Sequence, residues 1–214
     1  AAGYAATMAP SLMPVAAEVV RRAALQPAER VLDIGTSTGI AAAAARGEGR
    51  EVTAIDAAPG MLEIARAEVE GVTFEEMDFL RLAFGDESFD VILAAHCLLF
   101  ATDRVAAMRE WLRVTRLGGR VSLSVPGPDE ASPTSVYGQV YERFGIERDR
   151  GYPTEAEVAG YATDAGWLDI ETGADAAVAI VLADESAFRT WRAIGARGPA
   201  TAHFTQAQHD ALTD

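Results

Sequence analysis

The segment GTSTG, residues 35–39, is the first along the chain whose residue types and spacing suggest chemistry. It follows a short apolar run and precedes an alanine-rich stretch, so we expect it to connect a buried strand to a helix. Two patterns fit this loop. As G-x-S-x-G it is typical of the nucleophile elbow of α/β-hydrolases, with Ser37 as the attacking serine. As D-x-G-x-x-x-G, counted from Asp33, it is typical of a glycine loop that holds a nucleotide-like cofactor.

The hydrolase interpretation requires strands and an oxyanion-hole loop before the serine, and an acid and a histidine after it. A nucleophile elbow comes after several strands, and one of the preceding loops provides half of the oxyanion hole. Here only one predicted helix precedes the first predicted strand. An acid and then a histidine must follow the serine, and Asp175 or Asp184 with His203 would satisfy that order. A serine hydrolase therefore remains a minor alternative.

Two further carboxylates, Asp56 and Asp78, stand where the second and third predicted strands end. An acid at the end of the second strand accepts hydrogen bonds from ribose hydroxyls, so Asp56 favours an adenosine-containing ligand. The dinucleotide fingerprint G-x-G-x-x-G is incomplete, because Ser37 and Ile40 occupy two of its glycine positions. A nicotinamide-dependent oxidoreductase is therefore a second minor alternative.

Hydrophobic periodicity predicts the elements that must position these residues. The predicted strands are residues 31–34, 51–55, 72–77, 89–94 and 120–125. The predicted helices are residues 11–25, 40–46, 61–68, 104–115 and 154–165. The alternation predicts right-handed βαβ crossovers and a parallel sheet that helices cover on both faces.

The alternation breaks after residue 125, where three prolines fall within residues 126–133. Thr154 and Glu157 match a capping box at the start of the last predicted helix. We expect a sixth strand at residues 167–172, and residues 176–182 form a further apolar run.

Composition limits the classes of partner. The net charge of −14 argues against binding nucleic acid through its phosphates and against docking on anionic membranes. Cys97 is the single cysteine, which excludes an internal disulfide and favours a reducing compartment. Without an 18-residue apolar run or a signal-peptide layout, we expect a cytoplasmic protein.

Four blocks, in order and in register, resemble the class I S-adenosylmethionine-dependent methyltransferases, in particular small-molecule enzymes similar to quinone-biosynthesis methyltransferases. The blocks are VLDIGTSTG (31–39), VTAIDAAPGML (52–62), MDFLRLAFGDESFDVILAAHCLLF (77–100) and MREWLRVTRLGGRVSLSV (108–125). The sequence departs from the family at Ser37, where glycine is usual, and at Leu117, where a proline usually precedes the glycine pair. We expect this pair, Gly118 and Gly119, to form a turn between the helix at residues 104–115 and the strand at residues 120–125.

The resemblance implies an α/β fold, namely a Rossmann-like, doubly wound, mostly parallel sheet of seven strands. The last strand would be antiparallel and either missing or formed by residues 176–182. We expect residues 1–214 to form a single methyltransferase domain, in which residues 126–153 act as a lid over the substrate.

The resemblance also implies S-adenosyl-L-methionine as the cofactor and no metal. The residues expected to bind the cofactor lie at the strand ends and in the loops that follow them: Asp33, Gly35, Thr36, Ser37, Gly39, Asp56, Ala57, Met61, Asp78, Phe79 and Ala95. Asp33 would lie near the cofactor ammonium, Asp56 would bind the ribose hydroxyls, and Asp78 would accept the adenine amino group.

The expected reaction is in-line methyl transfer to a small-molecule acceptor, in which positioning and desolvation supply much of the reduction in the activation barrier. His96, directly after the fourth predicted strand, is the candidate base or orienting residue. Tyr4, Tyr137 and Tyr141 are candidate substrate contacts. We expect a monomer or homodimer, and the alternative is a regulatory or partner protein that binds the cofactor without turnover.

Overall fold

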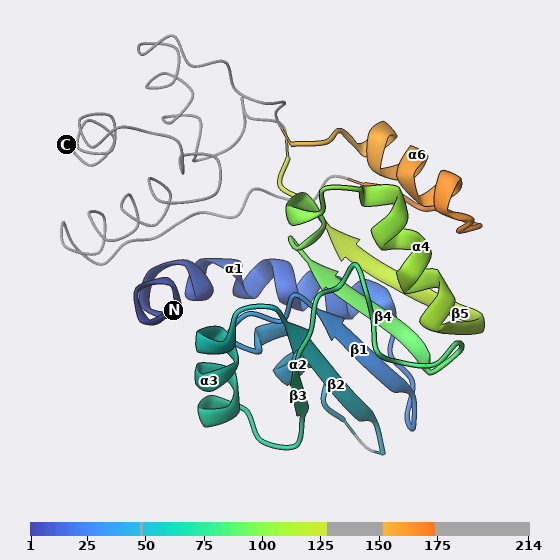
Figure 1. The fold of residues 1–214 in the computed structure, drawn as a ribbon. Coiled ribbons are helices and arrows are strands. Elements are labelled where there is room, and N and C mark those ends of the chain that lie inside the picture. The colour runs from blue at the N-terminus through green and yellow to red at the C-terminus, as the bar shows by residue number, and fades with distance from the viewer. Residues whose placement is uncertain (48, 128–151, 174–214) are drawn as a thin grey trace, which may run out of the picture.

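A five-stranded parallel sheet forms the centre of the computed structural model, which describes residues 1–47, 49–127 and 152–173 (Figure 1). The strands are β1 (Arg30–Ile34), β2 (Glu51–Asp56), β3 (Thr73–Glu76), β4 (Phe89–Ala95) and β5 (Thr115–Ser124). Their order is β3-β2-β1-β4-β5, and every neighbouring pair is parallel. The chain thus runs outward from β1 to β3 and then crosses to β4 on the other side. This confirms the predicted doubly wound arrangement and places its switch point between β1 and β4.

Helices cover both faces of the sheet, which explains why β1 and β4 are apolar nearly throughout (Figure 1). On one face, α1 (Ala2–Ala23) and α2 (Ile40–Ala45) contribute small residues to a cluster with alternate residues of β1, β2 and β4. On the other face, α4 (Arg104–Val114) and α6 (Glu155–Ala165) pack around the buried Trp111. The remaining elements are α3 (Pro59–Glu68) and the short 3₁₀ helix η1 (Leu98–Phe100).

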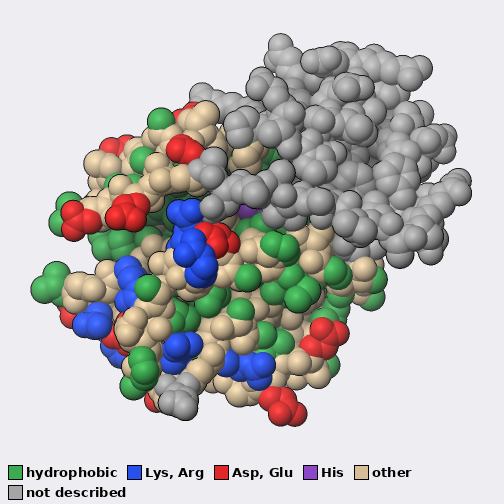
Figure 2. All heavy atoms as spheres, turned by 180° about the vertical axis from the view of Figure 1, so that it is seen from behind, with side chains coloured by type: hydrophobic (Ala, Val, Ile, Leu, Met, Phe, Trp, Pro, Cys, Tyr) green, Lys and Arg blue, Asp and Glu red, His purple; other side chains and the backbone are tan. Residues whose placement is uncertain are grey.

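The first helix is longer than periodicity predicts. It begins at Ala2 rather than near residue 11, and it contains Pro10 and Pro14. Proline disfavours a helix interior, so the sequence pattern points to a later start than the structure has. Near the end of α1, Arg21 and Arg22 both form ion pairs with Glu18. Figure 2 shows basic and acidic side chains next to one another on the face of the molecule that is hidden in Figure 1.

The glycine pair expected to form a separate turn lies inside β5. Phe89 pairs with Thr115 and Val91 with Arg120, so the residues between them bulge out of the ladder. A Cβ atom at Gly119 would lie 2.7 Å from the Asp90 carbonyl oxygen, which explains the need for glycine there. The predicted strand at residues 120–125 is therefore the second part of a longer one.

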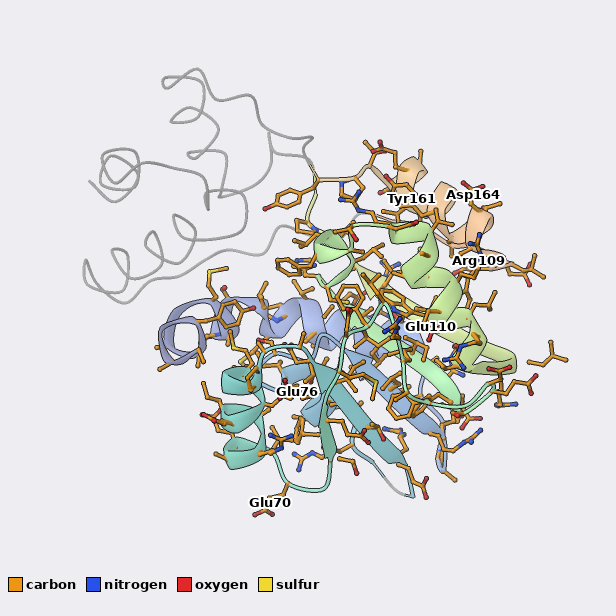
Figure 3. The ribbon with its side chains drawn as sticks, in the orientation of Figure 1. Glu70, Glu76, Arg109, Glu110, Tyr161 and Asp164 are labelled. Atoms are coloured by element: carbon orange, nitrogen blue, oxygen red, sulfur yellow. The ribbon has the colours of Figure 1, made fainter. Side chains whose placement is uncertain are left out.

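Helix α6 confirms the predicted cap. The Glu157 amide donates to the Thr154 hydroxyl, the Glu157 carboxylate accepts from the Thr154 amide at 2.8 Å, and Gly166 ends the helix with φ 102°. The helix packs on α4, where Arg109 donates to the Asp164 carbonyl at 3.0 Å (Figure 3).

The predicted sixth strand at residues 167–172 is wrong. Within the described part of the chain this segment forms no strand. Trp167 is buried and donates from Nε1 to the Met108 carbonyl, whereas Leu168 and Ile170 are exposed. Of the apolar residues in this segment, Trp167 is therefore buried because it packs on α4, and the pattern does not indicate a strand. Residues 176–182, and nearly all of 126–153, lie outside the described residues. No helix among those described is long and apolar enough to cross a membrane.

Candidate cofactor site

The residues singled out by the sequence gather at the carboxyl edge of the sheet. The loop at residues 35–39 follows β1, Asp56 ends β2, and His96 follows β4. The Met77 amide donates to the Asp56 carbonyl at 3.1 Å, which places Asp78 beside the end of β2. In open α/β sheets this edge, near the switch point, is where ligands bind.

The glycine loop has a left-handed backbone at three positions, with φ of 66° at Gly35, 53° at Ser37 and 85° at Gly39. A Cβ atom at Gly35 would lie 2.4 Å from the Cys97 Cβ, and one at Gly39 would lie 3.2 Å from Val69. Packing within the protein therefore requires glycine at position 35, whereas at position 39 the left-handed backbone and the close Val69 side chain both favour it. The structure thus gives a reason for glycine in this loop that does not depend on a ligand.

Asp33 is buried beneath the loop. Its Oδ2 accepts a hydrogen bond from the Thr36 hydroxyl at 2.6 Å, while Oδ1 has no hydrogen-bond partner among the described residues. Burial raises the pKa of Asp33 to about 7, and the hydrogen bonds from the Thr36 hydroxyl and the Ala42 amide oppose that shift. An unpartnered carboxyl oxygen in a buried place is costly unless a donor or a cation reaches it.

Asp56 joins the loop to the start of α3. Its Oδ2 accepts from the Ser37 amide at 2.8 Å and its Oδ1 from the Ala58 amide at 2.9 Å. The side chain is only half-buried, so both oxygens keep lone pairs that can accept further donors. Two oxygens held in this way suit a pair of neighbouring hydroxyls.

The Ser37 side chain makes contacts within the protein. Its hydroxyl lies 3.8 Å from the Met61 sulfur and forms a hydrogen bond with Tyr4. Burial raises the pKa of Tyr4, and the Ser37 hydrogen bond opposes that shift. The structure thus brings Tyr4, expected at the substrate, to the cofactor loop. Sequence reasoning missed this contact because the first turn of α1 was not predicted as helix.

Asp78 is exposed and turns the chain after β3. Its Oδ1 accepts from the Leu80 amide at 2.9 Å. Phe79 packs edge-to-face on Trp111, with ring centroids 6.1 Å apart, and its carbonyl accepts from the Trp111 indole at 3.2 Å. The segment after Asp78 is held by Glu110 on α4, whose carboxylate accepts from the Leu82 amide (Figure 3).

His96 leaves the sheet directly after Ala95 with a left-handed φ of 58°. Its amide donates to the Ser124 carbonyl at 3.1 Å, and its Nδ1 lies 3.0 Å from the Ser124 hydroxyl. Burial lowers the pKa of His96 and a hydrogen bond with the Ser124 backbone opposes that shift, so the net effect favours the neutral ring near neutrality. The sequence analysis did not identify Ser124 as a partner of His96. It could have done so, because Ser124 ends the strand that pairs with β4 and His96 directly follows β4.

The remaining candidates divide into three groups. Ala57 is exposed at the end of β2, and Met61 is half-buried on α3. Cys97 is fully buried, and burial raises the pKa of its thiol, so it is a packing residue. Tyr137 and Tyr141 lie outside the described residues. So do the histidine and the acids of the hydrolase alternative.

Metal ligands do not gather in the described ranges, where no group of three or more His, Cys, Asp or Glu side chains could hold an ion.

Comparisons with known proteins agree with this geometry. Residues 32–123 match the family described as "Methyltransferase domain". The chain is 30% identical over 163 residues to a demethylmenaquinone methyltransferase of Beutenbergia cavernae, covering 68% of each protein. It is 35% identical over 98 residues to a malonyl-[acyl-carrier protein] O-methyltransferase of Serratia marcescens, covering 46% of this chain and 38% of that protein.

Solved structures share the fold. A chain from the Haloferax volcanii complex between the Trm112 methyltransferase activator and a methyltransferase superposes with a TM-score of 0.59. The two are 26% identical, and the match covers 75% of each chain. A SAM-dependent methyltransferase of Aquifex aeolicus superposes with a TM-score of 0.56 at 22% identity, covering 73% of this chain and 82% of the other.

Proposed function

Since this chain belongs to the class I S-adenosylmethionine-dependent methyltransferases, we propose that it transfers the cofactor's methyl group to a small-molecule acceptor. The observation that carries the proposal is the pair of carboxylates around the glycine loop. Asp33 lies beneath the loop with one oxygen free, and Asp56 lies beside it with both oxygens oriented by backbone amides.

These residues fit the parts of the cofactor. The free oxygen of Asp33 suits the positive amino acid end, directly or through water, and the Asp56 carboxylate suits the two ribose hydroxyls. We propose that the other contacts come from the loop and from the chain after each strand: Gly35, Thr36, Ser37, Gly39, Ala57, Met61, Asp78, Phe79 and Ala95.

The cofactor, when bound, supplies a methyl group on a positively charged sulfur, so the acceptor needs only a nucleophilic atom in line with it. His96 is the described residue best suited to remove a proton from such an acceptor. Its half-buried, neutral ring can accept a proton without first losing one. In the proposed mechanism the protein therefore orients both partners, excludes water and accepts one proton.

For the acceptor we propose a hydroxylated aromatic ring of the quinol type. The support is the similarity to a demethylmenaquinone methyltransferase, which extends over 68% of both proteins. Loss of a hydroxyl proton makes such a ring nucleophilic at carbon as well as at oxygen, which gives His96 a role in either outcome.

The test is an incubation of the purified protein with methyl-labelled cofactor and short-chain demethylmenaquinol. We expect label in the organic-soluble product and release of an equal amount of the demethylated cofactor. His96→Gln should lower this rate by about a hundredfold, a usual contribution of a general base. Binding of the cofactor without transfer to the quinol or to small hydroxylated aromatics would instead favour the regulatory or partner protein without turnover.

A further inference from the structure

Ser124 contacts both the backbone and the ring of His96. The strands β4 and β5 are in register at Ala95 and Ser124, so His96 is the first residue beyond the paired part of β4. Its amide nevertheless donates to the Ser124 carbonyl at 3.1 Å, and its ring nitrogen Nδ1 lies 3.0 Å from the Ser124 hydroxyl. One residue thus fixes both the backbone and the ring of the candidate base.

The His96 backbone is held in an unfavourable conformation. A φ of 58° places a non-glycine residue in the left-handed region, which costs free energy that the surrounding contacts must offset. Such strain occurs where a side chain must be aimed in one direction. The hydrogen bonds to Ser124 are the contacts of His96 that can oppose a relaxation of this backbone.

The partners of a histidine ring influence which of its nitrogens carries the hydrogen, and the Ser124 hydroxyl can either accept from Nδ1 or donate to it. In the neutral ring, only one nitrogen carries hydrogen. Within residues 1–47, 49–127 and 152–173, the hydrogen bond of the ring is at Nδ1, and the second nitrogen, Nε2, has no hydrogen-bond partner. For Nε2 to accept a proton from an acceptor molecule it must be bare, and then the Nδ1 hydrogen donates to the Ser124 oxygen.

We propose that Ser124 is a positioning residue that accepts the Nδ1 hydrogen of His96 and so keeps Nε2 free to take a proton from the acceptor. The proposal rests on the proposed function of His96 as the base. Ser124 itself needs no contact with the cofactor or with the acceptor.

The same strand supplies a matched control. Ser122 lies two residues earlier on β5, on the same face of the strand, and donates from its hydroxyl to the Val19 carbonyl of α1 at 2.7 Å. Ser122→Ala removes a buried serine hydrogen bond without touching His96. Ser124→Ala removes the hydroxyl contact to Nδ1 and leaves the backbone of residue 124 in place, and Ser124→Thr keeps a hydroxyl on a residue that suits a strand.

The proposal is tested by long-range proton–nitrogen NMR of the histidine ring. The chain has three histidines, so His203→Gln and His209→Gln leave His96 as the only imidazole in the spectrum. At a pH where the ring is neutral, we expect hydrogen on Nδ1 and a bare Nε2. Ser124→Ala should give a mixture of the two tautomers, while Ser122→Ala and Ser124→Thr should keep the original pattern. Hydrogen on Nε2 in the unmodified ring, or an unchanged spectrum for Ser124→Ala, overturns the proposal.

Turnover supplies a second readout. Ser124→Ala should lower kcat for the quinol acceptor by about tenfold or more with an unchanged KM for the cofactor, and Ser124→Thr should restore kcat. An equal loss for Ser122→Ala would show a structural effect and overturn the proposal. Because the NMR measurement needs no acceptor, a wrong acceptor and a wrong role for Ser124 give different results.

Discussion

The two carboxylates beside the loop are the same residue type in opposite environments. Asp56 is half-buried and receives two backbone amides, whereas Asp33 is buried with one oxygen free. Burial without full hydrogen bonding destabilises the charged form, so the pKa of Asp33 rises to about 7. Asp33 therefore makes the folded apoprotein less stable once it is ionised, and a bound cation would remove that cost.

Replacing Asp33 with asparagine should reverse this effect in a pH-dependent way. The folded state keeps the Asp33 proton up to about pH 7, whereas the unfolded chain loses it near 3.8. The folded state thus binds more protons between these values, and its stability falls as pH rises through them. The free energy of unfolding of Asp33→Asn relative to the original protein should increase by roughly 2 to 3 kcal/mol between pH 5 and pH 8.

Urea unfolding at the two pH values measures this difference. Glu63→Gln, an exposed change on α3, is the control and should give the same relative stability at both. A relative stability of Asp33→Asn that does not vary with pH contradicts the account of Asp33.

At this scale the sequence predicts which acids lie at the ends of strands, because strand ends can be located from apolar runs. It cannot predict their charge states. Asp33 and Asp56 both stand at strand ends, and only the three-dimensional packing leaves one oxygen of Asp33 unpartnered. The Tyr4 contact with Ser37 was equally out of reach, because it joins residues that lie 33 positions apart across an unpredicted helical turn.

Among the elements, the turn from β1 into α2 has the least room for change. Gly35 faces the segment between β4 and η1, where the Cβ of Cys97 would overlap any side chain at position 35. The turn therefore fixes the distance between the glycine loop and the residues after β4. This contact keeps the glycine loop packed against the segment that contains His96.

Gly35→Ala should destabilise the protein by more than the cost of a left-handed alanine. Gly118→Ala is the matched control, because Gly118 has a similar φ of 75° and nothing within 4 Å of the added Cβ. We expect about 1 kcal/mol for the control, from backbone strain alone, and about 3 kcal/mol or more for Gly35→Ala. Thermal unfolding measures both.

Cys97→Gly combined with Gly35→Ala should recover part of the loss, since it removes the overlapping Cβ. Equal destabilisation by the two glycine replacements would mean that the Cys97 contact does not constrain the turn.

Elements were predictable where local chemistry determines them. The capping box at Thr154 and Glu157 fixed the start of α6, and Gly166 fixed its end. Prediction failed where contacts between residues far apart in the sequence determine the secondary structure. Residues 167–172 have a strand-like pattern, but Trp167 docks on α4 instead, and the glycine pair is a bulge because β4 pairs on both sides of it.

In the whole molecule, topology brings these residues together. Because all five strands run in one direction, the loops after β1, β2, β3 and β4 open on one edge of the sheet. The order β3-β2-β1-β4-β5 puts β1 next to both β2 and β4, so the glycine loop lies between Asp56 and His96. The alternation of strands and helices predicts this parallel arrangement and the family resemblance implies a doubly wound sheet, whereas the strand order itself comes from the structure.

Binding of the demethylated cofactor, S-adenosylhomocysteine, by titration calorimetry tests the account most directly. We predict saturable binding to the original protein and an affinity about thirtyfold lower for Asp56→Asn, because two hydroxyls lose a charged acceptor worth about 2 kcal/mol. Glu63→Gln should bind as the original protein does. An original protein that does not bind the compound, or an Asp56→Asn variant that binds it equally well while folded, would contradict the assignment of this edge of the sheet as the cofactor site.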